Sequence, residues 1–186
     1  MYNLIKGINL VYGEAATGKT TLAIQESLKE AKENKKIAFI DTENSFSTDR
    51  LKQMDENYNK LIKKIFLFNP KSFIEQHELI KKLNKFDFIV IDTIGHFYRR
   101  ELKENLYAAN ARLNKQLKIL KELNCKVLIT NQVYFDINKN RLRNVGDNIL
   151  AKHVDNIIKL EKNPRMVITK DKKINFKIED SGLVFS

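Results

Sequence analysis

The sequence predicts an α/β domain with a mostly parallel central sheet flanked by helices, and three observations support this. Short apolar runs of strand length recur, helical patterns separate them, and the C-terminal part changes to alternating apolar and polar residues. The apolar runs themselves do not alternate, as expected of parallel strands that are covered on both faces. They are INLVY at 8–12, KIAFID at 36–41, KIFLFN at 64–69, FDFIVID at 86–92 and KVLITN at 126–131.

Two segments between these strands have the spacing of amphipathic helices. In residues 20–34, Ile24, Leu28 and Ala31 share one helical face. A longer stripe precedes the last apolar run and consists of Leu106, Ala109, Leu113, Leu117 and Leu120. Each predicted helix therefore joins two strands of the sheet.

The C-terminal segment RMVITKDKKINFKIEDSG, residues 165–182, has a period of two. Ile174, Phe176 and Ile178 alternate with lysine and asparagine, and turn-forming residues surround Asp171. This pattern predicts an antiparallel hairpin that extends the sheet. No Pro- or Gly-rich linker, internal repeat or low-complexity tract divides the chain, so residues 1–186 are expected to form one domain.

Composition excludes several classes of protein. No run approaches the roughly 18 apolar residues of a membrane span, and the N-terminus lacks the order of charge, apolar core and small residues of a signal peptide. We therefore expect a cytoplasmic protein with no membrane partner. The single cysteine, Cys125, excludes an internal disulfide framework, and its setting in NCKVLITN favours a half-buried structural thiol over a nucleophile.

The formal net charge of +11 is concentrated in the second half of the chain. Residues 96–186 contain 19 Lys and Arg against 10 Asp and Glu, whereas residues 1–95 contain 15 against 13. Such an asymmetry indicates a polyanionic partner such as nucleic acid. Lysines that serve only as solvated surface residues would give the same count, so charge alone leaves both interpretations open.

The residues GEAATGKT, 13–20, follow the first predicted strand and precede a predicted helix, which is the P-loop pattern in its required context. The backbone N–H groups of such a loop point at phosphate oxygens, and the helix N-terminus adds about half a positive charge. We expect Lys19 to reach the β- and γ-phosphates of ATP and the Thr20 hydroxyl to ligate Mg²⁺. The predicted nucleotide-contacting residues are Gly13, Glu14, Ala15, Ala16, Thr17, Gly18, Lys19, Thr20 and Thr21.

Two further strands deliver polar residues to the same edge of the sheet. The strand 86–92 ends in Asp92, which is placed to orient Mg²⁺ and its water. The strand 36–41 is followed by Glu43, the candidate catalytic base, although a solvated loop acid is the competing interpretation. Gln132, at the end of the strand 126–131, is placed to report the γ-phosphate to the loop that follows it.

Five blocks in order resemble the RecA/RadA recombinase superfamily, and most closely the archaeal RadB family. They are GEAATGKT, FIDTE, FIVIDTIGHFYRRE, LNKQLKILKEL and LITNQV, within a resemblance that extends from Ile8 to about Leu160. It implies a RecA-like P-loop ATPase core with ATP and Mg as ligands. It further implies that Glu43 activates the hydrolytic water, that Gln132 senses the γ-phosphate, and that Arg50 lies against the adenine.

The resemblance also implies two DNA-facing loops, one after Asp92 and one after Gln132. Basic side chains on flexible loops suit contacts to DNA phosphates, and the charge excess in the second half agrees with this placement. The residues concerned are Arg99, Arg100 and Lys103 in the first loop, and Lys139, Arg141 and Arg143 in the second.

The chain also departs from the pattern of full recombinases. Only 12 residues precede Gly13, so the N-terminal helical DNA-binding domain is not expected, and the Phe-x-x-Ala docking segment occurs nowhere in the sequence. The expected function is an ATP- and DNA-binding accessory protein of homologous recombination and DNA repair, with weak ATP hydrolysis and no strand exchange of its own. Its expected protein partner is the main recombinase or a junction nuclease.

Two alternatives stay open. One is a DNA-stimulated recombinase-type ATPase, and the other is a KaiC-like signalling ATPase that does not bind DNA.

Overall fold

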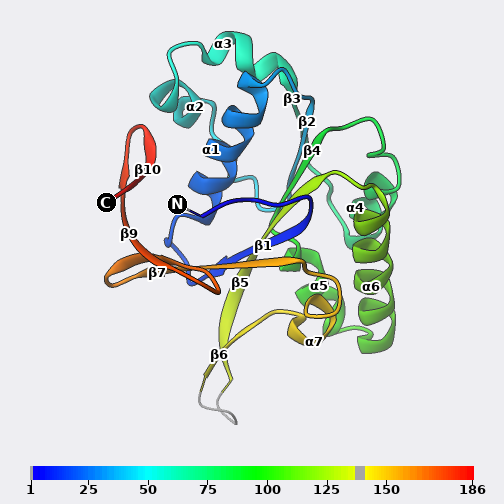
Figure 1. Cartoon of the computed structure of the whole chain (residues 1–186). Helices are drawn as coiled ribbons and strands as arrows, with labels where there is room; N and C mark the ends of the chain where they lie inside the picture. The colour runs from blue at the N-terminus through cyan, green and yellow to red at the C-terminus, as the bar shows by residue number, and fades with distance from the viewer. Residues whose placement is uncertain (1, 137–140) are drawn as a thin grey trace.

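The structure is a computed structural model and describes residues 2–136 and 141–186. These residues form a ten-stranded sheet flanked by helices (Figure 1). For residues 134–136 and 141–144 the structure describes the backbone alone. The strand order is β10-β9-β8-β7-β1-β5-β4-β2-β3, and β6 pairs with β5. The strands are β1 Gly7–Gly13, β2 Ile37–Asp41, β3 Ile65–Phe68, β4 Phe88–Asp92, β5 Lys126–Asp136, β6 Arg141–Asn144, β7 Asn156–Lys162, β8 Arg165–Ile168, β9 Lys173–Glu179 and β10 Gly182–Phe185.

The central strands are parallel and the C-terminal strands are antiparallel, which confirms the predicted fold class. All neighbouring pairs from β7 through β1, β5, β4 and β2 to β3 are parallel, whereas β7, β8, β9 and β10 pair antiparallel in succession. The predicted hairpin around Asp171 is β8 and β9. The sequence did not predict β7, whose residues NIIKLEK mix charged and apolar side chains, or the four-residue β10.

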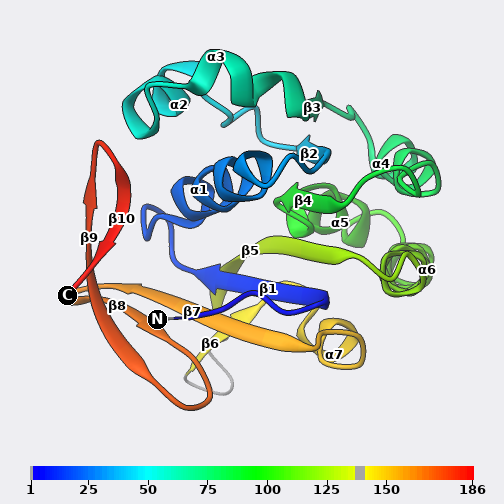
Figure 2. The same ribbon diagram turned by 45° about the horizontal axis from the view of Figure 1, so that its top comes forward.

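Helices cover both faces of the parallel strands (Figure 2). One face packs against α1 Lys19–Lys32 and α2 Thr48–Met54, and α3 Tyr58–Leu61 and a 3₁₀ turn, Ile62–Lys64, lie on the same side. The other face packs against α4 Phe73–Ile80, α5 Gly95–Leu102, α6 Leu106–Glu122 and α7 Asp147–Leu150. Because both faces are covered, every residue of β2 and β4 is buried, which explains why their sequences do not alternate.

The two predicted amphipathic helices are α1 and α6. Ile24, Leu28 and Ala31 of α1 are buried as predicted, and so are the last four members of the α6 stripe. Leu106 is the exception, with 53% of its surface exposed. It is the first residue of α6, directly after the Asn105 side chain that accepts the Ala108 N–H, and this end of the helix reaches beyond the core.

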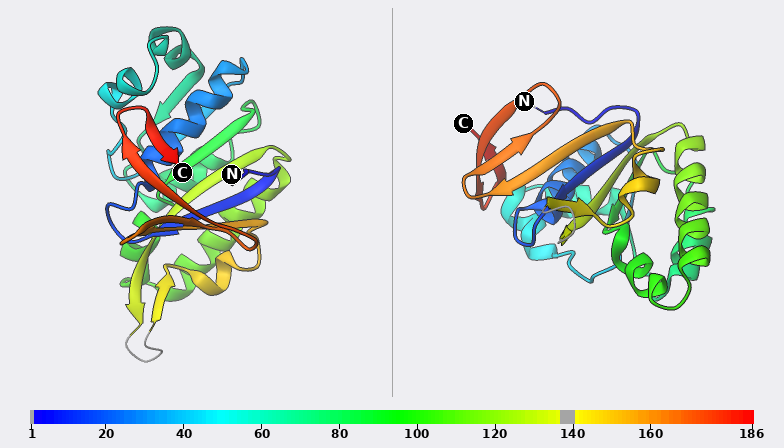
Figure 3. Two further views of the ribbon diagram at one scale, coloured as in Figure 1. Left: turned by 60° about the vertical axis from the view of Figure 1, so that its left-hand side comes forward. Right: turned by 90° about the horizontal axis from the view of Figure 1, so that it is seen from below.

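The C-terminal strands β9 and β10 curve over and lie beside α1 (Figures 2 and 3). The Gln25 side chain of α1 fixes β10, because its oxygen accepts the Leu183 N–H at 2.8 Å and its NH₂ group donates to the Leu183 carbonyl at 3.1 Å. The rings of Tyr2 and Phe185 pack with centroids 5.4 Å apart, so both ends of the chain meet here. This arrangement brings Ile178 of β9 against Gly18, the residue before α1.

Beyond Gln132, β5 leaves the parallel sheet and pairs with β6 as an antiparallel hairpin that projects from the body of the molecule (Figures 1 and 3). The backbone of the second predicted DNA-facing loop is therefore partly a hairpin. Lys139 lies outside the described residues, and Arg141 and Arg143 are described only as backbone within β6. No helix in the described ranges is long and apolar enough to cross a bilayer.

Candidate nucleotide-binding site

The carboxyl ends of β1, β2, β4 and β5 meet at one edge of the sheet, as the sequence predicts. The pairing register places Asp41 beside Asp92 and Gly13 beside Gln132. A pocket of about 330 Å³ opens at this edge. It is lined by Ala15, Ala16, Gly18, Lys19, Thr20, Thr21, Glu43, Asp92, Thr93, Gln132 and Ile178.

The loop between β1 and α1 is closely packed at two glycines and ends at an uncapped helix N-terminus. Gly18 adopts a φ of +98°, which side chains rarely tolerate, and a Cβ there would lie 2.9 Å from Ile178. A Cβ on Gly13 would lie 2.4 Å from the carbonyl oxygen of Leu160. No side chain caps the N-terminus of α1 and its first turn holds no acidic residue, so the first N–H groups and the positive end of the helix dipole stay available to an anion.

Lys19 is buried at the floor of this loop without a carboxylate partner among the described residues. Its Nζ donates to the carbonyl oxygens of Gly13 at 2.9 Å and Glu14 at 2.7 Å. Burial lowers the pKa of Lys19, while nearby carboxylates, Asp92 foremost, oppose that shift. An ammonium group held only by carbonyl oxygens gains strongly from an anionic ligand.

Asp92 is 1% exposed and accepts hydrogen bonds from three hydroxyl groups. The donors are Thr20 Oγ1 at 2.7 Å, Ser45 Oγ at 3.1 Å and Thr130 Oγ1. Burial raises the pKa of Asp92, and the three hydroxyls oppose that rise. Thr20 and Asp92 together present the hydroxyl and carboxylate oxygens that Mg²⁺ prefers.

No group of three or more His, Cys, Asp or Glu side chains within the described ranges is arranged to bind a metal ion. Cys125 is half-buried as predicted, and burial raises its pKa, which disfavours the reactive thiolate.

Glu43 lies inside the pocket and is not a solvated loop acid. Gln132 Nε2 donates to both of its carboxylate oxygens, at 3.0 and 3.2 Å, and Thr93 Oγ1 donates at 3.3 Å. His96 Nδ1 of α5 lies 3.4 Å from Glu43 Oε1. The loop itself is held by Asp41, whose carboxylate accepts the backbone N–H groups of residues 43, 45 and 46.

The sequence analysis missed several members of this site, namely Ser45, Thr93, His96 and Thr130. A signal exists for Thr130, because it is a polar residue inside the apolar strand KVLIT. Ser45 and His96 could not be predicted from spacing, because the folding of their loop and helix over the strand ends brings them to the carboxylates.

Three predicted nucleotide-contacting residues line a neighbouring cavity. Gly13, Glu14 and Thr17 line a space of about 510 Å³, and Glu14 pairs with Lys162 at 3.1 Å. Arg50 does not line the phosphate pocket. Its Nη2 donates to the carbonyl oxygen of Glu179 at 2.5 Å, and Glu179 is the last residue of β9, the strand that bears Ile178.

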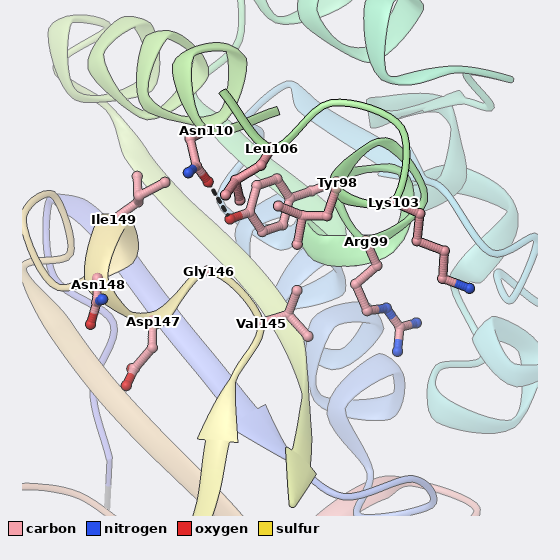
Figure 4. A pocket seen from close by; sticks show the side chains of 11 residues that line it. Tyr98, Arg99, Lys103, Leu106, Asn110, Val145, Gly146, Asp147, Asn148 and Ile149 are labelled. Atoms are coloured by element: carbon pink, nitrogen blue, oxygen red, sulfur yellow. Dashed lines mark hydrogen bonds between the residues drawn. The ribbon is translucent and has the colours of Figure 1, made fainter. Parts of the chain in front are cut away.

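The prediction of a loop after Asp92 is wrong, because residues 95–102 form the helix α5. Phe97 and Tyr98 bury in the core and hold the segment helical, while Arg99, Arg100 and Lys103 are exposed. Arg99 and Lys103 line a cavity of about 580 Å³ between α5, α6 and α7 (Figure 4), and Arg100 faces a smaller one beside α4.

Comparison with known proteins agrees with this geometry. The AAA domain family model matches residues 8–117. DNA repair and recombination protein RadB of Pyrococcus abyssi is 35% identical, over 93% of this chain and 82% of that protein. The RadB of Thermococcus sibiricus is 39% identical, over 84% of this chain and 73% of that protein. The chain belongs to the RadB family.

The solved structures agree with the family and the fold. The crystal structure of the RadB recombinase has a TM-score of 0.79 and 29% identity, covering 97% of this chain and 91% of that one. A KaiC-like protein of Pyrococcus horikoshii OT3, at 20% identity and a TM-score of 0.75, shares the fold. This member of the RadB family thus has a RecA-like, AAA-type ATPase domain, a class of domain that binds and hydrolyses nucleotide.

Proposed function

We propose that this chain is an ATP- and DNA-binding accessory protein of homologous recombination and DNA repair, with weak ATP hydrolysis and no strand exchange of its own. The observation that carries the proposal is the convergence of Lys19, Thr20, Asp92 and Glu43 in one pocket at the sheet edge. Its relatives are named DNA repair and recombination proteins, which supports the assignment to repair.

The residues of the pocket divide the chemistry of ATP hydrolysis among them. The loop N–H groups and the Lys19 ammonium would bind the β- and γ-phosphates, and this requires Lys19 to exchange its two carbonyl partners for phosphate oxygens. Thr20 and Asp92 would hold Mg²⁺, whose charge offsets that of the phosphates. Glu43 would accept the proton of the attacking water, and Arg50 would stack on the adenine beside the β9–β10 turn.

The contacts of Glu43 support slow turnover. Gln132 donates to both of its carboxylate oxygens, so the attacking water would have to share these oxygens with an amide donor. Gln132 also stands where β5 leaves the sheet for the projecting hairpin. A change at the γ-phosphate would therefore reach the hairpin through one side chain.

The DNA-binding half of the proposal depends on the cations of α5 and of the hairpin. Arg99, Arg100 and Lys103 are exposed and offer charge without sequence preference. Replacing Arg141 and Arg143 by Ala should weaken DNA binding about equally across sequences and flatten its dependence on salt. Unchanged binding would remove the hairpin from the DNA interface.

The function is tested by steady-state ATP hydrolysis at low salt, with and without single-stranded DNA, using Lys19→Ala as the blank. We expect slow turnover that requires Lys19, in a protein that binds both ligands. Strong stimulation by DNA would instead indicate a recombinase-type motor. Failure to bind DNA at low salt would indicate a nucleotide-dependent signalling protein.

A further inference from the structure

The contacts of Glu43, the proposed base, are concentrated on one of its two carboxylate oxygens. Oε1 lies 3.0 Å from Gln132 Nε2, 3.3 Å from the Thr93 hydroxyl and 3.4 Å from Nδ1 of His96. Among the described residues, only Gln132 Nε2 donates to Oε2, at 3.2 Å. Each carboxylate oxygen offers about two lone-pair sites. Oε2 is therefore the oxygen with room for the attacking water.

His96 stands on backbone that is fixed to the sheet. Ile94, two residues before it, donates its N–H to the carbonyl oxygen of Thr130 in β5 at 3.1 Å. His96 lies in the first turn of α5, and its ring lies at 89° to the buried ring of Phe97, with the ring centroids 4.8 Å apart. The start of α5 therefore holds the imidazole beside Glu43.

The hydrogen bonds from Gln132 to Glu43 are the ones that a nucleotide would disturb. In the proposed function the Gln132 amide senses the γ-phosphate, yet its nitrogen contacts both oxygens of Glu43. An amide nitrogen has two hydrogens to donate, so an amide that turns toward the phosphate leaves at least one of these oxygens. Thr93 and His96 then remain beside Oε1.

We propose that His96 is a positioning residue for ATP hydrolysis, which holds Oε1 of Glu43 through a proton on Nδ1 so that Oε2 receives the proton of the attacking water. The water oxygen attacks the γ-phosphorus and ADP leaves. Hydrogen bonds between catalytic groups are often long before substrate binds and shorten in the complex, which suits the distance of 3.4 Å. This inference rests on the proposed function, since it takes Glu43 as the base.

The test compares substitutions of His96 that differ in where they place a hydrogen-bond donor. The amide nitrogen of Asn lies close to the position of imidazole Nδ1, that of Gln lies close to the position of Nε2, and Leu has no donor. Because slow turnover is expected, hydrolysis is measured in single turnovers with the protein in excess of radiolabelled ATP, and Lys19→Ala is the blank.

The donor at the position of Nδ1 should decide the rate. We expect His96→Leu and His96→Gln to lower the maximal rate about 10-fold with ATP affinity unchanged, because a misplaced base affects the transition state and not the binding of ATP. His96→Asn should stay within about 3-fold of the wild type. His77→Asn is the matched control, since it makes the same change at a partly exposed histidine of α4 outside the phosphate pocket, and it should turn over as the wild type does.

The outcomes separate this inference from the proposed function. Equal rates in the wild type and His96→Leu, or equal losses in His96→Asn and His96→Leu, overturn the positioning role while Glu43→Gln still abolishes hydrolysis. If Glu43→Gln hydrolyses ATP at the wild-type rate, the base assignment and this inference both fail.

A measurement on the unaltered protein covers the case in which the His96 variants do not fold. Nitrogen NMR of protein labelled in its three histidines shows which ring nitrogens carry a proton. Spectra of His77→Asn and His153→Asn identify the signals of the other two rings. We expect a proton on Nδ1 of His96, and a signal that shifts in Glu43→Gln. A His96 ring whose proton is on Nε2 alone overturns the proposal.

Discussion

The two ends of α1 treat buried charge in opposite ways. At its C-terminal end the Glu30 carboxylate, 1% exposed, pairs with Lys35 at 2.6 Å and Lys126 at 2.5 Å. At its N-terminal end Lys19 and Asp92 are also buried, yet among the described residues the Lys19 ammonium donates only to carbonyl oxygens and the Asp92 carboxylate accepts only from hydroxyl groups. Buried charges without a charged partner raise the free energy of the folded state. The difference teaches that the paired charges at the C-terminal end of α1 stabilise the fold, whereas the unpaired charges at its N-terminal end are available to bind a ligand.

The largest effect is expected when the ligand-binding charge is removed. Lys19→Ala should weaken ATP binding about 100-fold or more, because the phosphates lose a charge-assisted hydrogen bond inside a buried loop. Titration with a fluorescent ATP analogue measures this. Lys29→Ala, which changes an exposed lysine on the same helix, is the matched control and should bind as the wild type does. Undiminished affinity in Lys19→Ala would refute the site.

Glu43→Gln separates binding from chemistry at the same end. The amide has the size of the carboxylate but cannot accept the proton of the attacking water, so hydrolysis should fall about 100-fold while ATP affinity changes little. Phosphate release and analogue binding, measured on one preparation, give the two values. If turnover persists at the wild-type rate, another group is the base.

Glu30→Gln tests the opposite end of α1, where the charge is paired. Burial raises the pKa of Glu30, but its hydrogen bonds to Lys126 and Lys35 outweigh burial and leave the pKa below its usual 4.5. A carboxyl whose folded pKa is lowered stabilises the fold above the unfolded pKa, and this stabilisation is lost as the pH falls through the folded pKa. We expect Glu30→Gln to lower the free energy of unfolding by about 1–3 kcal/mol at pH 7, and by much less near pH 3.

Urea unfolding at the two pH values measures this difference. Glu33→Gln is the matched control, because Glu33 also pairs with Lys35 at 2.6 Å but is exposed to solvent. An exposed pair contributes about 0–1 kcal/mol. Equal losses in the two variants would show that the burial of Glu30 does not matter.

The smallest effect on stability is expected at Asp92, in spite of its burial. Its pKa is raised in the folded protein, so its ionised form opposes folding at pH 7, and this penalty disappears as the pH falls and the carboxyl is protonated. Asp92→Asn should therefore change the free energy of unfolding by less than about 1 kcal/mol, or increase it, while ATP hydrolysis is lost. Urea unfolding at pH 7 measures the change, and a loss as large as that of Glu30→Gln would erase the contrast between the two ends.

The strands and the phosphate loop could be predicted because they depend on local sequence. Buried parallel strands have continuous apolar runs, and the P-loop needs Gly, Lys and Thr at fixed spacing between a strand and a helix. Asp92, Glu43 and Gln132 followed from one rule, that parallel strands end at a common edge. All three line the pocket.

Tertiary packing decided what the sequence could not predict. The segment after Asp92 is helical because Phe97 and Tyr98 pack into the hydrophobic core. The local sequence of these eight residues does not reveal that packing. Arg50 was expected beside adenine, and its hydrogen bond to Glu179, the last residue of β9, depends on a strand far along the chain. The pairing of Glu30 with Lys126 likewise spans 96 positions.

The most direct test of the account is the free energy of unfolding of the wild type with and without ATP and Mg²⁺. If the buried charges at the N-terminal end of α1 bind nucleotide, ATP at about 100 times its dissociation constant should raise the free energy of unfolding by about 2.7 kcal/mol. Lys19→Ala should show no such gain. A wild type that unfolds at the same urea concentration with and without the ligand would contradict the central claim.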